Sequence, residues 1–157
     1  MGHSADEEES RGVRITIVDF SAKSDLGSIN YLCKGWEMAK ILLVDDSSFS
    51  RSLVRGLLKS AGHEVVEAAD GVEAVDKYED ERPDAVLMDI TMPRMDGLNA
   101  LVSIRRYDPR ARVTMLTAVA EKNTAITAIK MGARDFVIKP FNEDRILTAV
   151  HRMLTPS

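Results

Sequence analysis

The chain has 157 residues, a formal net charge of −4, 45% hydrophobic residues and 29% charged residues. This length suits one compact domain with an extension, and the composition excludes both a disordered chain and a membrane-inserted one. The negative charge argues against direct binding to nucleic acid. One cysteine excludes an internal disulfide, three scattered histidines disfavour a zinc site, and an acidic start unlike a secretory signal predicts a cytoplasmic protein.

Residues 1–37 contain one alternating stretch, residues 13–17, that would suit a short strand. They are expected to be a flexible extension or to lie upstream of the true start, because Met38 leads directly into the first predicted strand. The alternative is an extra edge strand or a docking arm. The predicted domain is 38–157, and no second domain is expected after Leu154.

From Lys40 onward, a short apolar run, a turn and a longer stretch of helical period follow one another five times. Strands are expected at Ile41–Val44, Glu64–Ala68, Ala85–Met88, Val113–Leu116 and Phe136–Ile138, and helices at Phe49–Ala61, Val72–Asp80, Leu98–Tyr107, Lys122–Met131 and Glu143–Leu154. This alternation predicts an α/β fold, in which a five-stranded parallel sheet is covered by helices on both faces.

Apolar stripes are expected to turn two of these helices toward the core. The stripes consist of Phe49, Leu53, Leu57 and Ala61 in the first helix and of Ala125, Ile126, Ala128 and Ile129 in the fourth. Gly62 and Gly132 follow these helices, and glycine is a common residue at the end of a helix.

Polar side chains follow four of the predicted strands. Asp45 and Asp46 follow the first strand, Asp89 the third, Thr117 the fourth and Lys139 the fifth. Since ligands of an open parallel sheet bind beyond the carboxyl ends of its strands, these side chains are expected to converge at one edge. Three clustered carboxylates repel one another, so a divalent cation such as Mg²⁺ is the expected compensation. Together with Lys139, it would offset the charge of a transferring phosphoryl group.

Each of these residues also has an ordinary structural explanation, such as helix capping or strand propensity. Their joint placement favours a functional site over those explanations. Two other classes of protein fit less well. An aspartate-nucleophile phosphatase would show an Asp-x-Asp pattern after the first strand, whereas Ser47 follows the adjacent pair Asp45 and Asp46. A flavodoxin-like cofactor carrier would need a phosphate-binding loop there, and the acidic pair would repel a phosphate.

Four segments resemble the response-regulator receiver family: Ile41–Asp46, Met88–Gly97, Thr117-Ala118 and Asp135–Phe141. The resemblance extends from Met38 to Leu154. It implies a doubly wound, flavodoxin-like (CheY-like) (βα)5 domain whose parallel strands have the order 2-1-3-4-5. It also implies a cis peptide bond between Lys139 and Pro140.

The resemblance assigns roles to the residues at the strand ends. Asp89 would be the phosphoacceptor, and Lys139 would pair with the phosphoryl oxygens. Mg²⁺ would be held by Asp46, Asp89 and the backbone oxygen of Thr91, with Asp45 acting mainly through water. The domain would be a signalling receiver that catalyses its own phosphorylation and dephosphorylation, and not a metabolic enzyme.

The resemblance also implies a two-state switch. Thr117 would donate its hydroxyl to the phosphoryl group while Phe136 turns inward; static core packing is the alternative for Phe136. The expected output surface comprises Lys122, Ile126, Phe136, Ile138 and Arg145.

The likeness is greatest to stand-alone CheY-like chemotaxis regulators. It implies a CheA-like sensor histidine kinase as phosphodonor and a flagellar or archaellar motor component as output partner. The alternative is a phosphorelay intermediate, which passes its phosphoryl group to a histidine of another protein.

Overall fold

The computed structural model describes residues 38–155. The expectations for residues 1–37, including the strand at residues 13–17 and the domain boundary, lie outside these residues and stay predictions. Within the described part, no helix is long and apolar enough to cross a membrane.

Five parallel strands form one sheet in the order β2-β1-β3-β4-β5, which confirms the predicted fold and order. The strands are β1 (Lys40–Val44), β2 (Glu64–Ala68), β3 (Ala85–Asp89), β4 (Val113–Ala118) and β5 (Asp135–Lys139). Each predicted strand is present, and most are one or two residues longer than expected. The central strand β3 is buried along its whole length. This is why it appears in the sequence as an unbroken apolar run.

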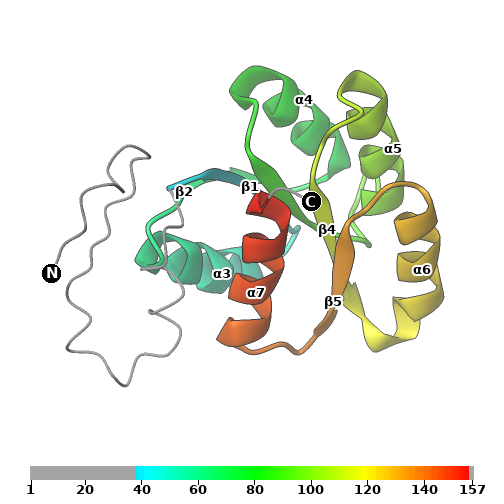
Figure 1. Ribbon diagram of the computed structural model, residues 1–157. Coiled ribbons are helices and arrows are strands. Elements are labelled where there is room, and N and C mark those ends of the chain that lie inside the picture. The colour runs from blue at the N-terminus through cyan, green and yellow to red at the C-terminus, as the bar shows by residue number, and fades with distance from the viewer. Residues whose placement is uncertain (1–37, 156–157) are drawn as a thin grey trace, which may run out of the picture. The chain divides into compact units, whose positions relative to one another are not determined.

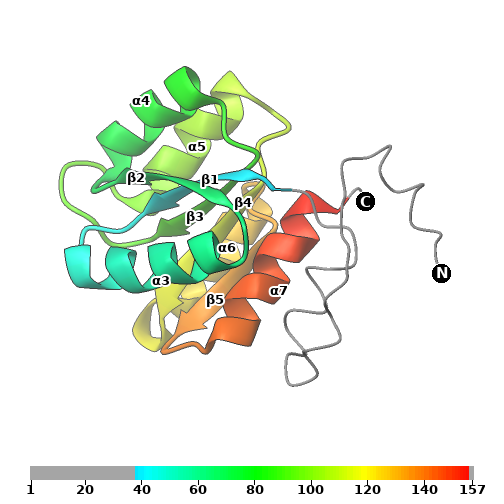
Figure 2. The same cartoon turned by 90° about the vertical axis from the view of Figure 1, so that its left-hand side faces the viewer.

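The helices are α3 (Ser48–Ser60), α4 (Gly71–Glu81), α5 (Gly97–Tyr107), α6 (Lys122–Lys130) and α7 (Glu143–Leu154). A short 3-10 helix, η3 (Val119–Glu121), follows β4 and was not predicted. Helices α3 and α7 lie on one face of the sheet, while α4 and α5 lie on the other (Figures 1 and 2). The predicted two-faced arrangement is confirmed.

Successive side chains of each strand enter different cores, because their directions alternate across the sheet. In β1, Leu42 and Val44 belong to the core beneath α4, α5 and α6. Ile41 and Leu43 belong to the core beneath α3 and α7. All four side chains are fully buried. The two cores therefore hold the central strands from both sides.

The predicted core-facing stripe of α3 is wrong at its start. Phe49 and Leu53 are 72% and 61% exposed, whereas Val54 and Leu58 are buried. Both pairs have four-residue spacing, so the spacing alone could not choose between them. A row of four-residue steps also drifts around a helix of 3.6 residues per turn.

The stripe of α6 was also assigned partly wrongly. Ala125 and Ala128 are buried, but Ile126 and Ile129 are 42% and 38% exposed. The side of α6 that meets the sheet is thus the side with small residues. Gly132, which follows the C-cap Met131 of this helix, has a φ of +113°, as expected of a glycine that ends a helix.

Candidate functional site

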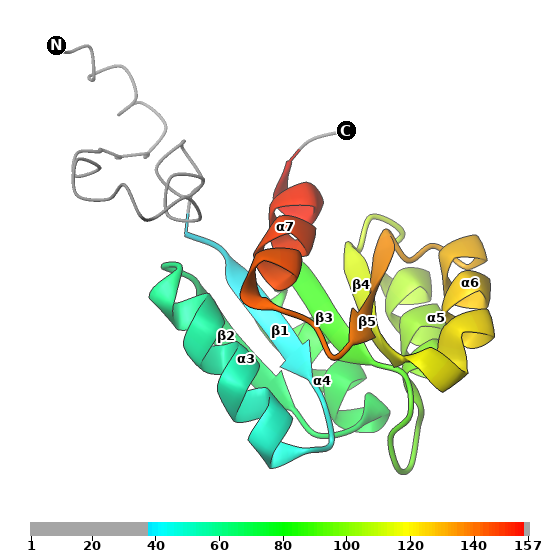
Figure 3. The same ribbon diagram turned by 90° about the horizontal axis from the view of Figure 1, so that it is seen from below.

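The carboxyl ends of the strands bring the predicted acidic residues to one edge of the sheet. Asp45 and Asp46 directly follow β1, and Asp89 is the last residue of β3. Val44 pairs with Met88 across these adjacent strands, so the next residue of each strand, Asp45 or Asp89, occupies a neighbouring position. The loops that follow β1 and β3 leave the sheet at this edge (Figure 3).

The three carboxylates form a compact cluster. Asp45, Asp46 and Asp89 each offer a ligand oxygen, and these oxygens lie within 4.8 Å of one another. Asp45 and Asp89 are buried, whereas Asp46 is exposed. Carboxylate oxygens are hard ligands that suit Mg²⁺, and an open side leaves room for water or a phosphate. The donor set therefore fits the divalent cation expected from the sequence.

Lys139, the last residue of β5, reaches the same cluster. Its Nζ lies 3.4 Å from Oδ1 of Asp89 and 3.5 Å from Oδ2 of Asp45. The peptide bond that follows it, Lys139–Pro140, is cis, as the resemblance implied. One ammonium group thus contacts two of the three carboxylates and partly offsets their repulsion.

The Asp89 carboxyl group is difficult to ionise in this setting. Its burial raises its pKa to about 6, Lys139 opposes the increase, and the negative charge of Asp45 adds to it. The Ile90 amide also donates a hydrogen bond to its Oδ1, at 3.0 Å. Since burial and a like charge disfavour the carboxylate, a bound cation would stabilise the charged form that can act as a nucleophile.

Asp45 is held in place by its neighbours. Its backbone amide donates to the carbonyl of Ala68 at 3.1 Å, and its Oδ1 accepts from the Ser47 amide at 2.9 Å. The N-cap of α3 is Ser47, whose side chain accepts from the Ser50 amide. Neither acidic residue therefore caps this helix, and Asp46 keeps its exposed carboxylate available for a ligand.

The loop after β3 is packed closely against the strand. The Gly97 amide donates to the carbonyl of Ile90 at 2.6 Å. A Cβ atom added at Gly97 would lie 2.1 Å from the backbone oxygen of Asp89, so only glycine fits there. Thr91 lies in this loop and is exposed. Its role as a backbone ligand stays a prediction.

The loop after β3 is also held by an ion pair between Arg94 and Asp70, which was not expected from the sequence. Asp70 is buried and caps α4 by accepting from the Glu73 amide at 2.9 Å, while its other oxygen accepts from Nε of Arg94 at 2.8 Å. The Glu73 amide and the Arg94 guanidinium hold the pKa of Asp70 below its usual value. The sequence signal was only an Asp before Gly71 at a helix start, which indicates a cap and not a partner.

The two predicted switch residues lie on the other side of the site. Thr117 is fully buried, and its hydroxyl donates to the carbonyl of Ala118 at 3.0 Å. Phe136 is half-buried and packs against the core beneath α4, α5 and α6. Arg145 of α7 donates to the Phe136 carbonyl at 2.8 Å. The switching roles of Thr117 and Phe136 stay predictions.

The predicted output residues come from three neighbouring elements. Lys122 and Ile126 are exposed on α6, while Phe136, Ile138 and Arg145 are half-buried on β5 and α7. Strand β5 lies at one end of the sheet, between α6 and α7 (Figure 1). The five residues thus come from adjacent elements, but their part in partner binding is a prediction.

Comparison with known proteins agrees with this fold. Residues 41–151 match the response regulator receiver domain. The chemotaxis protein CheY of Listeria monocytogenes is 47% identical over 116 residues, which cover 73% of this chain and 98% of that protein. The chemotaxis protein CheY of Bacillus subtilis is also 47% identical over 116 residues, which cover 73% and 97%.

A solved structure shows the same fold. It is the CheX-CheY-BeF3-Mg+2 complex from Borrelia burgdorferi, with a TM-score of 0.72 and 34% sequence identity, and the match covers 78% of this chain and 93% of that chain. The strand order, the acidic cluster at the strand ends and these matches lead to one conclusion. The chain belongs to the response-regulator receiver family and contains a CheY-like receiver domain of two-component signalling.

Proposed function

We propose that this receiver is a phosphorylation-dependent switch whose phosphoacceptor is Asp89. The observation that carries the proposal is the position of the buried Asp89 carboxylate within an acidic cluster, 3.4 Å from the ammonium group of Lys139. A carboxylate in this position can act as a nucleophile toward phosphorus while a lysine offsets the charge that arrives.

In the proposed reaction, an oxygen of Asp89 attacks the phosphorus of a phosphohistidine on a sensor histidine kinase. A P–O bond forms, the P–N bond breaks, and the histidine leaves with its electron pair. Lys139 pairs with the phosphoryl oxygens. Asp45, Asp46, Asp89 and the backbone oxygen of Thr91 would hold Mg²⁺, which when bound neutralises the carboxylates and phosphoryl oxygens. Later attack by water on the acyl phosphate returns free Asp89 and inorganic phosphate.

The signal would leave through the surface of α6, β5 and α7. After phosphorylation, the Thr117 hydroxyl would turn from the Ala118 carbonyl to the phosphoryl group, and Phe136 would move inward. The Arg145 contact to the Phe136 carbonyl, at 2.8 Å, supports a link between this side chain and α7. Such a switch needs a ligand that favours one of two conformations, and the phosphoryl group is that ligand.

The proposed setting is chemotaxis. The support is that the Listeria and Bacillus relatives are chemotaxis proteins and that the Borrelia relative was crystallised with CheX. A CheA-like kinase would supply the phosphoryl group, and a flagellar or archaellar motor component would be the output partner. A phosphorelay intermediate would use the same acceptor and differ only in passing the group to another protein's histidine. The cytoplasmic location stays a prediction.

Intact mass spectrometry tests the chemistry. The parent, Asp89→Asn and the control Asp80→Asn, which changes an exposed carboxylate of α4, are incubated with acetyl phosphate, with and without Mg²⁺. We expect one phosphoryl adduct on the parent and on Asp80→Asn, only with Mg²⁺, and none on Asp89→Asn. An adduct that persists in Asp89→Asn, or that forms equally without Mg²⁺, would overturn the proposal.

A further inference from the structure

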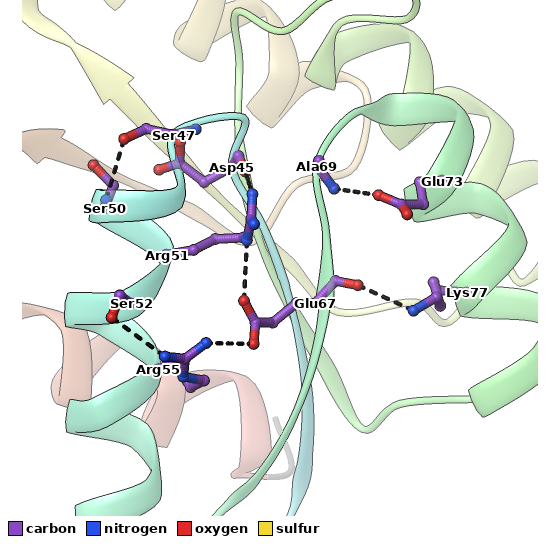
Figure 4. Close-up of polar contacts among 10 residues, drawn as sticks. All are labelled: Asp45, Ser47, Ser50, Arg51, Ser52, Arg55, Glu67, Ala69, Glu73 and Lys77. Atoms are coloured by element: carbon purple, nitrogen blue, oxygen red, sulfur yellow. Dashed lines mark hydrogen bonds and ion pairs between the residues drawn. The ribbon is translucent and has the colours of Figure 1, made fainter.

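A charged network joins α3 to β2 beside the acidic loop (Figure 4). Arg51 of α3 donates from Nη1 to the backbone oxygen of Asp45 at 2.6 Å, and from Nε to Oε1 of Glu67 at 3.0 Å. One guanidinium group therefore connects the edge strand β2 to the loop that carries two of the three clustered carboxylates.

Glu67 is itself held by two other side chains. Its Oε2 accepts from Nη1 of Arg55 at 2.7 Å, and its backbone oxygen accepts from Nζ of Lys77 at 3.2 Å. The hydrogen bond from Arg55, followed by that from Arg51, holds the pKa of Glu67 below its usual value. Since the Arg51 side chain is only 19% exposed, its position is restricted, and Glu67 is a fixed anchor for it.

The contact to the Asp45 carbonyl completes the immobilisation of that residue. Its amide donates to Ala68, its Oδ1 accepts from Ser47, and its carbonyl accepts from Arg51. The peptide group is planar, so fixing the carbonyl of Asp45 also fixes the direction of the Asp46 amide and the position of its Cα atom. The peptide group that leads into Asp46 is thus held in one orientation.

We propose that Arg51 is a positioning residue: anchored by Glu67, it holds the Asp45 carbonyl and thereby sets the affinity of the carboxylate cluster for a divalent cation. This rests on the proposed function, because it assumes that the cluster binds Mg²⁺. Residues that orient metal ligands without touching the metal commonly change metal affinity when they are replaced.

The sign of the effect separates positioning from simple electrostatics. Arg51 is a positive charge beside a cation site, so its removal by charge alone would make Mg²⁺ bind more tightly. Loss of positioning would instead make Mg²⁺ bind more weakly. Arg55 is a matched control, because it also pairs with Glu67, but its hydrogen bonds are to Glu67 and Ser52 and not to the acidic loop.

Calorimetric titration with Mg²⁺ of the parent, Arg51→Gln and Arg55→Gln tests the proposal. We expect a dissociation constant about tenfold higher for Arg51→Gln, and one no higher than the parent's for Arg55→Gln. Arg51→Lys keeps the charge without the two-pronged guanidinium and should fall between the parent and Arg51→Gln. Urea unfolding in EDTA should show a larger loss of stability for Arg51→Gln, which loses the bond to the Asp45 carbonyl as well as the ion pair with Glu67, but both glutamine variants should remain folded.

Arg51→Gln that binds Mg²⁺ as tightly as the parent, or more tightly, would overturn the positioning role while leaving the proposed function intact. Equal weakening in Arg55→Gln would also overturn it, because the carbonyl contact would then be irrelevant. A folded parent that binds no Mg²⁺ would overturn the proposed function together with this inference.

Discussion

The site has an acidic side, formed by the loops after β1 and β3, and a switch side at the end of β4 around Thr117. These two sides are held in different ways. On the acidic side, the loops after β1 and β3 are bonded to other elements, through Arg51 to Asp45 and through Arg94 to Asp70. On the switch side, the Thr117 hydroxyl bonds to the next residue, Ala118. The carboxylates are therefore arranged before a ligand arrives, whereas the hydroxyl can be redirected without breaking a contact between distant elements.

Lys139 connects the two sides, because it ends β5 and contacts the carboxylates that follow β1 and β3. Strand β5 is tied to α7 at its other end, where Arg145 bonds to Asp135 and Phe136. Loss of a contact that restrains the acidic side should therefore cost more stability than loss of the Thr117 contact. Single substitutions test this difference.

The largest effect is expected for Gly97→Ala. The added Cβ atom would meet the Asp89 backbone oxygen at 2.1 Å, and backbone cannot yield as a flexible side chain can. We expect a loss of about 3 kcal/mol in the free energy of unfolding, measured by urea denaturation. The control is Gly56→Ala in the exposed part of α3, where nothing lies within 4 Å of the new atom. Because alanine has the higher helix propensity, this change should raise the free energy of unfolding by about 0.5–1 kcal/mol. A loss below about 1 kcal/mol at Gly97 would show that the acidic side can move.

The second prediction concerns the cost of the Asp89 charge in the metal-free protein. Its folded pKa of about 6 lies above the unfolded value near 3.8, so the folded state binds more protons between these values and its stability falls as pH rises through this window. At pH 8, the free energy of unfolding of Asp89→Asn should exceed that of the parent by about 2 kcal/mol. One pKa unit corresponds to about 1.4 kcal/mol, and water that reaches the site reduces the full effect.

The stability difference between Asp89→Asn and the parent should become small near pH 4 and disappear below about pH 3, where the carboxyl is protonated in both states. Urea unfolding in EDTA at several pH values measures it. A parent whose stability relative to Asp89→Asn is the same at pH 4 and pH 8 would contradict this account. Added Mg²⁺ should stabilise the parent more than Asp89→Asn.

A smaller effect is expected for Asp70→Ala, which removes both the cap of α4 and the partner of Arg94. We expect the free energy of unfolding to fall by about 1.5 kcal/mol, and amide hydrogen exchange in residues 90–96 to become faster. The control Asp96→Ala removes a cap of α5 that bonds only to the Asn99 amide, so it should cost about 1 kcal/mol. If exchange in the loop after β3 is unchanged in Asp70→Ala, the Arg94 contact does not restrain that loop.

The smallest change in stability is expected for Thr117→Val, which removes only the hydroxyl bonded to Ala118 and should cost less than about 1 kcal/mol. The phosphoryl adduct should still form. Hydrogen exchange in residues 117–121 should respond to BeF3⁻ with Mg²⁺ in the parent but much less in the variant. An equal response in Thr117→Val would rule out the hydroxyl as the switch.

Thr114→Val is the matched control on the same strand. The Thr114 hydroxyl is buried and has no hydrogen-bond partner among residues 38–155. Its removal should stabilise the protein by about 1 kcal/mol, because a buried unpaired hydroxyl is unfavourable, and the response to BeF3⁻ should remain.

The sequence alone was sufficient for the fold and for most of the acidic site. Short apolar runs, several of them unbroken, predicted the strands. Residues at the strand ends, such as Asp45, Asp89 and Lys139, converge because parallel strands end at the same edge. The strand order came from the resemblance to receivers. The strands and the polar residues at their ends depend on local pattern, which each segment carries by itself.

The tertiary structure decided which surfaces and partners meet. The spacing of α3 fitted Phe49 and Leu53 as well as Val54 and Leu58, and only contact with the sheet selected the second pair. Likewise, nothing in the pattern of α3 distinguishes Arg51 from Arg55, and only the pairing of β1 with β2 places Glu67 beside the acidic loop, where Arg51 joins the two. Pairings between distant segments depend on how helices and strands pack, and the pattern of any one segment does not contain that information.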